Sequence, residues 1–85
     1  MNKEVQDAIS RNIKLLRKHS HLSQEEFCTL MNCSRTTYSG YECGYRLPDL
    51  VGLYDLALAN NLEVGDFFLE SPEAFLNVLS TKTNK

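Results

Sequence analysis

The sequence lacks the features that would assign it to a membrane or secreted class. None of its apolar runs approaches the ~18 residues that a membrane span needs. Its first ten residues, MNKEVQDAIS, contain no apolar stretch of the kind found in a signal peptide. Its three cysteines are odd in number and irregularly spaced, which is not typical of a disulfide framework. We therefore expect a cytoplasmic protein with no membrane partner.

An excess of basic residues is also lacking. The chain has 9 Lys and Arg against 11 Asp and Glu, a formal net charge of -2, and this total alone argues against a nucleic-acid partner. The charges are unevenly divided, however. Residues 1–48 carry seven basic and five acidic side chains, a net +2, whereas residues 49–85 carry two basic and six acidic, a net -4. The first part can present a positive surface to a polyanion; alternatively, both parts are ordinary solvated surface.

Enzyme signatures are the third absence. The 85 residues, 42% hydrophobic and 24% charged, are typical of one globular domain. A chain this short buries only about 60–65% of its unfolded surface, which leaves little room for a catalytic cleft. It has no glycine-rich phosphate loop, and its cysteines and histidines do not follow the paired spacing of a zinc site. We expect no enzyme activity, no metal and no cofactor.

What the sequence does contain is helical periodicity, and no segment shows convincing strand alternation, which predicts an all-α fold. Four apolar residues at helical spacing indicate a first helix: Val5, Ile9, Ile13 and Leu16. Ser23 followed three residues later by Glu26 is a capping-box pattern. It begins a second helix that we expect to end near Leu30.

A third helix follows after a very short turn. Residues 31–33 are predicted as the turn, because the central Asn32 tolerates the left-handed conformation. Ser34 can cap a helix over residues 35–43, and Gly44 can end it. Two helices joined by so few residues form a helix-turn-helix.

Three more helical segments are predicted in the second half. Pro48 suits the first turn of a fourth helix, which ends at Asn60–Asn61 and has an inner stripe of Leu50, Leu53, Leu56 and Ala57. A short fifth helix over residues 65–69 places Phe67 or Phe68 in the core.

Ser71 and Pro72 are start signals for a sixth helix, over residues 72–80. A polar tail follows from Ser80. The helix carries four apolar residues: Phe75, Leu76, Val78 and Leu79. They suggest a dimer contact, with packing back onto the same core as the alternative.

Three motifs around the helix pair follow one another closely: LSQEEF at 22–27, SRTTYSGYECG at 34–44 and RLP at 46–48. Their order and spacing resemble the Cro and lambda-repressor type (XRE family) of helix-turn-helix DNA-binding domain. The resemblance covers about residues 9–69.

This resemblance implies a five-helix lambda-repressor-like DNA-binding domain over residues 1–70, with the helix-turn-helix at about 23–43. Residues 71–85 are then an additional C-terminal helix and polar tail, with a possible role in a dimer contact.

The resemblance also implies that residues 35–43 are the recognition helix, lying in the major groove. Gln24 would contact phosphate and brace a recognition-helix side chain, while the loop after the helix touches phosphate. Arg35 is the expected base reader, because Arg can donate two parallel hydrogen bonds to guanine; its other possible role is a phosphate clamp or a solvated charge. The implied DNA-binding residues are Gln24, Ser34, Arg35, Thr36, Thr37, Ser39, Gly40, Tyr45 and Arg46.

Other matched positions have structural roles. Arg17 and Glu42 match a family ion pair that joins the first helix to the end of the recognition helix. Cys28 and Cys33 stand at positions that imply small core fillers. Gly40 supplies no reading side chain, so it either concentrates base contacts in the first turn or admits a close backbone approach to DNA.

The function implied is a sequence-specific regulator that binds double-stranded DNA. We expect a repressor that binds an inverted-repeat operator as a homodimer and has no small-molecule effector, since one recognition helix covers only about half a turn of groove. The alternative is an antitoxin-like or other protein-interaction module of the same fold, in which DNA binding is secondary.

Overall fold

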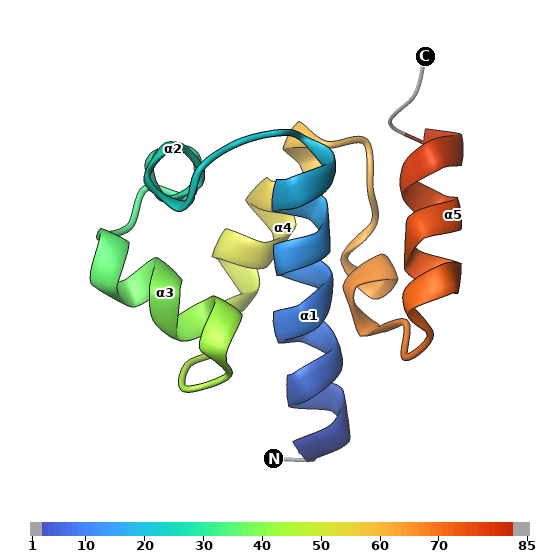
Figure 1. The fold of residues 1–85 in the computed structure, drawn as a ribbon, viewed down its shortest axis with the longest axis horizontal. Coiled ribbons are helices and arrows are strands. Elements are labelled where there is room, and N and C mark those ends of the chain that lie inside the picture. The colour runs from blue at the N-terminus through green and yellow to red at the C-terminus, as the bar shows by residue number, and fades with distance from the viewer. Residues whose placement is uncertain (1–2, 83–85) are drawn as a thin grey trace.

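The longest helix, α1 (Lys3–His19), lies in the middle of the fold (Figure 1). The computed structural model describes residues 3–82 and contains no strand within that range, so the all-α prediction is confirmed. The other elements are α2 (Gln24–Leu30), α3 (Arg35–Cys43), α4 (Leu50–Ala59), the 3-10 helix η1 (Val64–Phe68) and α5 (Pro72–Lys82). In the described part of the chain, no helix has the length and apolar character to cross a membrane.

The helix α1 organises the rest because its buried face contacts elements on both sides. Ile9, Ile13 and Leu16 of the predicted stripe are buried, and Val5 packs against the core from its edge. The α1 helix packs against α3 on one side and against η1 and α5 on the other. Figure 1 shows α2 and α3 on the side opposite α5.

The core draws one or more side chains from every helix. Tyr38 of α3 is fully buried and lies with its ring centroid 5.5 Å from that of Phe27 in α2. Phe67 and Phe75 make a similar pair, at 5.9 Å, between η1 and α5. The core residues are Ile9, Ile13, Leu16, Phe27, Cys28, Tyr38, Leu53, Leu56, Ala57, Leu62, Phe67, Phe75 and Leu79.

A buried polar side chain ties α1 to η1. The Asn12 amide nitrogen donates hydrogen bonds to the carbonyl oxygens of Phe67 (3.0 Å) and Leu69 (2.8 Å). Arg11 also donates to the Leu69 carbonyl, at 3.0 Å. A buried amide without such partners costs free energy; here the amide donors are used to fix the chain reversal after η1.

The predicted helix ends in the first half are confirmed. Ser23 and Glu26 form the capping box of α2, and the Ser34 hydroxyl accepts a hydrogen bond from the Thr37 backbone at the start of α3. Asn32 has a φ of 56° in the turn between them, and Gly44 ends α3 with a φ of 85°.

The start of α4 differs from the prediction. Asp49 is its N-cap, and the Asp49 carboxylate accepts a hydrogen bond of 2.7 Å from the Gly52 backbone nitrogen. Asp is a stronger N-cap than most residues, so the helix begins at Leu50 and Pro48 lies before the cap rather than in the first turn. Leu50, expected on the inner stripe, is 73% exposed, whereas Leu53, Leu56 and Ala57 are buried as predicted.

The C-terminal elements are shifted by one or two residues. The 3-10 helix η1 begins at Val64 and ends at Phe68, and of its two phenylalanines Phe67 is buried. The helix α5 continues past Ser80 to Lys82, whose amine forms ion pairs with Asp66 (3.1 Å) and Glu63 (3.6 Å). Residues 83–85 of the predicted polar tail lie outside the described residues.

The alternative role for α5, packing onto the same core, holds for its inner face. Phe75 and Leu79 are fully buried there, and Val78 packs against the core. Leu76 is the large apolar residue of α5 that stays exposed.

Candidate nucleic-acid interface

The outward face of α3, one residue of α2 and the loop after α3 surround an open hollow. Its lining residues are Gln24, Arg35, Thr36, Ser39, Gly40, Cys43, Tyr45 and Arg46. Seven of them are among the nine residues that the family resemblance assigned to DNA binding. The fold therefore brings most of the predicted site together on one surface.

Arg35 is held at the edge of this hollow by Gln24. Its Nε donates a hydrogen bond of 3.2 Å to the side-chain oxygen of Gln24. The Gln24 side-chain nitrogen in turn donates to Glu42 at 2.9 Å, which fixes the orientation of the amide. The resemblance implied that Gln24 braces a recognition-helix side chain, and that side chain is Arg35. Because the contact uses Nε, the two terminal nitrogens of Arg35 remain available for a planar, two-donor contact.

The Glu42 carboxylate connects three helices. It accepts hydrogen bonds from Arg17 of α1 (2.5 Å from Nε), from Gln24 of α2 and from the Tyr38 hydroxyl of α3 itself. Its side chain is only 3% exposed and that of Arg17 13%. The ion pair that the resemblance implied is thus present, and it is joined by two partners that were not predicted.

The protonation states in this cluster follow from these contacts. Burial raises the pKa of the Glu42 carboxyl, but the hydrogen bonds from Arg17, Tyr38 and Gln24 together lower the pKa to below its ordinary value. The hydrogen bond to Glu42 raises the pKa of Arg17, and burial together with the same carboxylate raises the pKa of the Tyr38 hydroxyl. At neutral pH the cluster is therefore a carboxylate, a guanidinium and a neutral phenol.

Gly40 also has a structural role that was not considered in the sequence analysis. It is buried, and a Cβ built on it would lie 3.2 Å from Cδ and 3.3 Å from Cγ of Arg46. The space left by the missing side chain is thus occupied by the aliphatic part of Arg46. The Gly40 carbonyl also accepts the backbone N–H groups of Gly44, Tyr45 and Arg46, so this residue positions the loop that carries Arg46.

Two predicted residues lie outside the hollow, and one lining residue was missed. The Ser34 hydroxyl is used in the helix cap and also donates to the Thr37 hydroxyl at 3.0 Å. Cys43 lines the hollow without having been assigned to it. Helical spacing could have identified it, because Cys43 follows Thr36 and Gly40 at i+7 and i+3 on the same face of α3.

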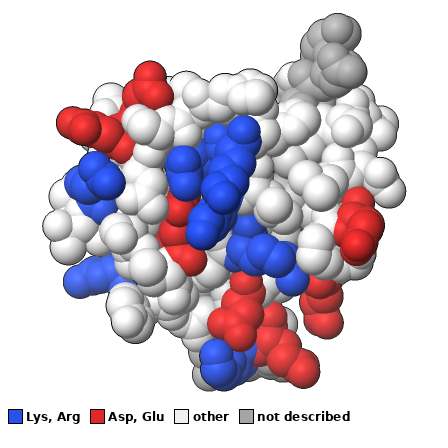
Figure 2. Space-filling view, in the orientation of Figure 1, with Lys and Arg blue, Asp and Glu red and all other residues white. Residues whose placement is uncertain are grey.

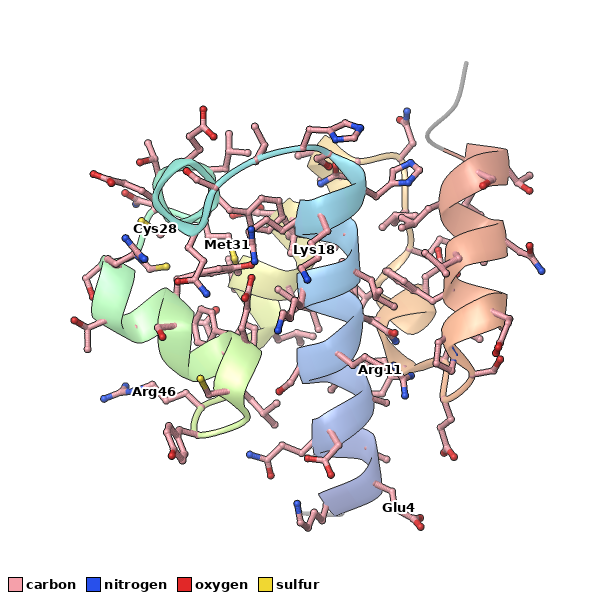
Figure 3. The ribbon with its side chains drawn as sticks, in the orientation of Figure 1. Glu4, Arg11, Lys18, Cys28, Met31 and Arg46 are labelled. Atoms are coloured by element: carbon pink, nitrogen blue, oxygen red, sulfur yellow. The ribbon has the colours of Figure 1, made fainter. Side chains whose placement is uncertain are left out.

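Positive charge accompanies this surface. Figure 2 shows Lys and Arg in a band over α1 and at the edge of the molecule beside α3, whereas the charged residues over α2 are acidic. Arg46 extends from the loop after α3, away from α1 (Figure 3). Tyr45 beside it is 86% exposed. An arginine-bearing surface with exposed hydrogen-bonding side chains matches the chemistry of a phosphate backbone and base edges.

A comparison with known families identifies this arrangement. A family model described as "Helix-turn-helix", of the Cro and lambda-repressor type (XRE family), matches residues 13–67. The chain belongs to this family. The matched range spans α1 from Ile13 through η1 to Phe67, so it includes both helices that build the hollow. Searches of curated proteins and of solved structures gave no match.

Membership in this helix-turn-helix family assigns the chain to the DNA-binding transcription regulators. Its nucleic-acid partner is double-stranded DNA. The negative total charge is therefore no obstacle to DNA binding, since the surface potential near the contact decides that interaction.

Proposed function

We propose that the chain is a cytoplasmic repressor that recognises a specific sequence of double-stranded DNA through α3 in the major groove. The observation that carries this proposal is the hydrogen bond from Arg35 to Gln24. It supports an exposed arginine at the start of α3 that is held through Nε, so that its two terminal nitrogens can serve a base contact. A well-made two-donor contact from Arg to guanine contributes about 1–3 kcal/mol of discrimination against the wrong base.

The other residues of the surface have two roles: some contact base edges, and others bind the phosphate backbone of the DNA. Thr36 and Ser39 line the hollow on α3 and contact base edges. Tyr45 and Arg46 bind phosphate from the loop, while the backbone N–H groups of the first two residues of α3 bind phosphate without a side chain. Gln24 contacts phosphate while it supports Arg35, and Gly40 keeps Arg46 in place.

A homodimer on an inverted repeat follows from the size of the reading element. The α3 helix has nine residues and is therefore ~13 Å long, much less than the ~34 Å of one DNA turn. Two copies with their recognition helices one turn apart read two half-sites. A dimer of this kind that covers a promoter excludes polymerase, which is why we assign repression.

Selection of binding sites from random duplex DNA, followed by sequencing, tests the function. We expect the wild-type protein to select an inverted repeat. Arg35→Ala should lose the preference at one or two positions of each half-site, corresponding to roughly 10- to 100-fold less discrimination there. Arg46→Ala should weaken binding to all sequences about equally, because a phosphate contact carries no base information.

Two results would contradict the proposal. Recovery of no motif by the wild-type protein at low salt would remove sequence-specific binding as the function. Identical behaviour of the two arginine variants would remove the division into a base reader and a phosphate contact.

A further inference from the structure

A second polar contact joins α1 to the end of α3, about three helical turns before the ion pair of Arg17 with Glu42. The Gln6 side-chain nitrogen donates a hydrogen bond of 2.8 Å to the carbonyl oxygen of Gly44. Gln6 lies near the start of α1 and is partly buried, and Gly44 is the residue that ends α3. The bond therefore links the beginning of the chain to the end of the recognition helix.

The carbonyl that accepts this bond belongs to a helix end. The last carbonyl groups of a helix have no partner within the helix and need a donor from elsewhere. Gly44 has a left-handed φ of 85°, so the chain leaves the helical path there, and the Gln6 amide supplies the donor. A side chain of α1 thus completes the cap of α3.

The same peptide group is also held from its other side. The backbone N–H of Tyr45 donates to the Gly40 carbonyl at 3.0 Å, and that of Arg46 donates to it at 3.2 Å. The peptide between Gly44 and Tyr45 therefore has its carbonyl bound by α1 and its N–H bound by α3. A peptide group is planar, so fixing both polar ends fixes the direction in which the chain enters the loop.

Gln6 is the side chain of α1 that makes this connection, although other residues of α1 lie close by. A Cβ built on Gly44 would be 3.8 Å from the Ser10 hydroxyl and 3.9 Å from the Asp7 carboxylate. Asp7 pairs with Lys3 at 3.2 Å, and the buried Ser10 hydroxyl has no hydrogen-bond partner among the residues that the structure describes. The direction of the loop thus depends on the Gln6 amide.

We propose that Gln6 is a positioning residue for DNA binding, which sets the direction of the loop that carries Arg46 to a DNA phosphate. It acts through the peptide that follows Gly44 and makes no contact with DNA itself. The proposal rests on the proposed function and adds a residue to it. Gln6 precedes the residues covered by the family resemblance and by the matched family model, so neither assigns it a role.

The consequence for binding follows from the geometry of hydrogen bonds. A hydrogen bond weakens steeply when its donor is misaligned, so a loop that leaves α3 in a variable direction makes a poorer phosphate contact. The base contacts of Arg35 depend on Gln24 and Glu42 instead. Loss of the Gln6 amide should therefore lower the affinity for every sequence and leave the base preferences unchanged.

The experiment removes the amide and tests whether the effect passes through Arg46. Gln6→Met keeps the length of the side chain and a good helix former but has no donor, and Gln6→Ala is a second variant without the donor. Ser10→Ala, one turn later on the same face of α1, removes a hydroxyl without a partner and is the matched control. Each change is made in the wild-type and in the Arg46→Ala protein. Titrations use a duplex with one selected half-site and an unrelated duplex.

We expect Gln6→Met and Gln6→Ala to lower the affinity for both duplexes by about three- to tenfold, the range of one net hydrogen bond. Site selection with either variant should give the wild-type motif. In the Arg46→Ala protein the same changes should lower the affinity by less than about twofold, because the contact that Gln6 positions is already absent. Ser10→Ala should stay within about twofold of its parent in both proteins.

A purely structural role gives a different result. If Gln6→Met lowers the affinity by the same factor in the two proteins, or leaves it unchanged in the wild-type protein, the proposal is wrong. A changed motif would likewise overturn it, since Gln6 would then act on base contacts.

Amide hydrogen exchange of the DNA-free protein separates this proposal from the proposed function. The Tyr45 and Arg46 amides should exchange about fivefold faster or more in Gln6→Met, and the Phe75 amide of α5 should keep its wild-type rate. Unchanged exchange at Tyr45 and Arg46 would show that Gln6 does not hold the loop. If the wild-type protein selects no motif, the proposed function fails, and the exchange rates still decide whether Gln6 fixes the loop.

Discussion

The Glu42 side chain connects three helices of the domain through hydrogen bonds. One carboxylate receives hydrogen bonds from three helices, and through Gln24 it also determines where Arg35 lies. Removing one partner of a buried ion pair leaves an uncompensated charge, which costs more free energy than the pair contributed. Glu42 therefore couples the stability of the domain to the geometry of its DNA-facing surface.

This coupling predicts a specific pH dependence for Glu42→Gln. The pKa of Glu42 is lower in the folded protein than its ordinary value, so its contribution to the unfolding free energy is present above the unfolded pKa of about 4.3 and is lost as the pH falls through the folded pKa. At pH 7 Glu42→Gln should be about 3 kcal/mol less stable than wild type. Between pH 5 and pH 3 it should lose less stability than wild type does.

Urea unfolding across pH 3–7 measures both effects. Glu70→Gln, which changes an exposed carboxylate, is the matched control and should follow the wild-type curve. Parallel curves for wild type and Glu42→Gln below pH 5 would contradict the role assigned to this carboxylate.

For individual residues, the sequence allowed us to predict an ion pair but not the larger hydrogen-bonded cluster to which it belongs. Arg17 and Glu42 could be paired because a family resemblance connects them. The additional contacts of Tyr38 and Gln24 could not be predicted, because they depend on side-chain rotamers at the junction of three helices. The same limit applies to Gly40. Its contact with the Arg46 side chain depends on the conformation of the loop after α3, which the sequence did not predict.

Among the elements, α3 ends at a position that depends on one glycine. Gly44 has a φ of 85°, a conformation that costs a residue with a Cβ about 1–2 kcal/mol. A Cβ there would meet no atom closer than 3.8 Å, so the cost of Gly44→Ala is backbone strain alone. We expect that variant to lose about 1–2 kcal/mol of unfolding free energy.

Gly65→Ala is its control. A Cβ at Gly65 would meet no atom within 4 Å, and we expect the unfolding free energy to change by less than about 0.5 kcal/mol. Thermal or urea unfolding of both variants measures the difference. Equal losses at the two positions would show that the left-handed conformation at Gly44 is not what the substitution disturbs.

Element boundaries were predictable where the cap was unambiguous. Ser23, Ser34 and Gly44 each offer one strong signal, and the helices begin or end there. Before α4, Pro48 and Asp49 both carry start signals, and the hydrogen bond formed by Asp49 decides between them. The one-residue difference matters because it accompanies the unexpected exposure of Leu50 at the first position of α4.

At the scale of the whole molecule, the uneven charge distribution remains compatible with DNA binding. The acidic residues of 49–85 include Asp66 and Glu63, which pair with Lys82 of the same segment. The basic residues of the first half stay concentrated over α1 and α3 (Figure 2). The net charge alone argued against a nucleic-acid partner, because it does not show where on the surface the basic residues lie.

Salt dependence tests the whole assembly. If each subunit neutralises about four phosphates, the logarithm of the association constant of a dimer should fall with the logarithm of salt concentration at a slope near −7. Binding of one subunit to a single half-site should give about half that slope. Fluorescence anisotropy titrations between 50 and 300 mM salt measure both, and the same slope for the two duplexes would exclude a bound dimer.

The hydrogen bond between Arg35 and Gln24 also affects the thermodynamics of recognition. A free arginine side chain loses roughly 2 kcal/mol of conformational entropy when it is fixed by a ligand. Part of that loss has already occurred in the unbound protein, because Gln24 restricts Arg35 before DNA arrives. Binding to the correct base therefore begins from a partly ordered guanidinium, and a larger share of the enthalpy of that contact is retained as affinity.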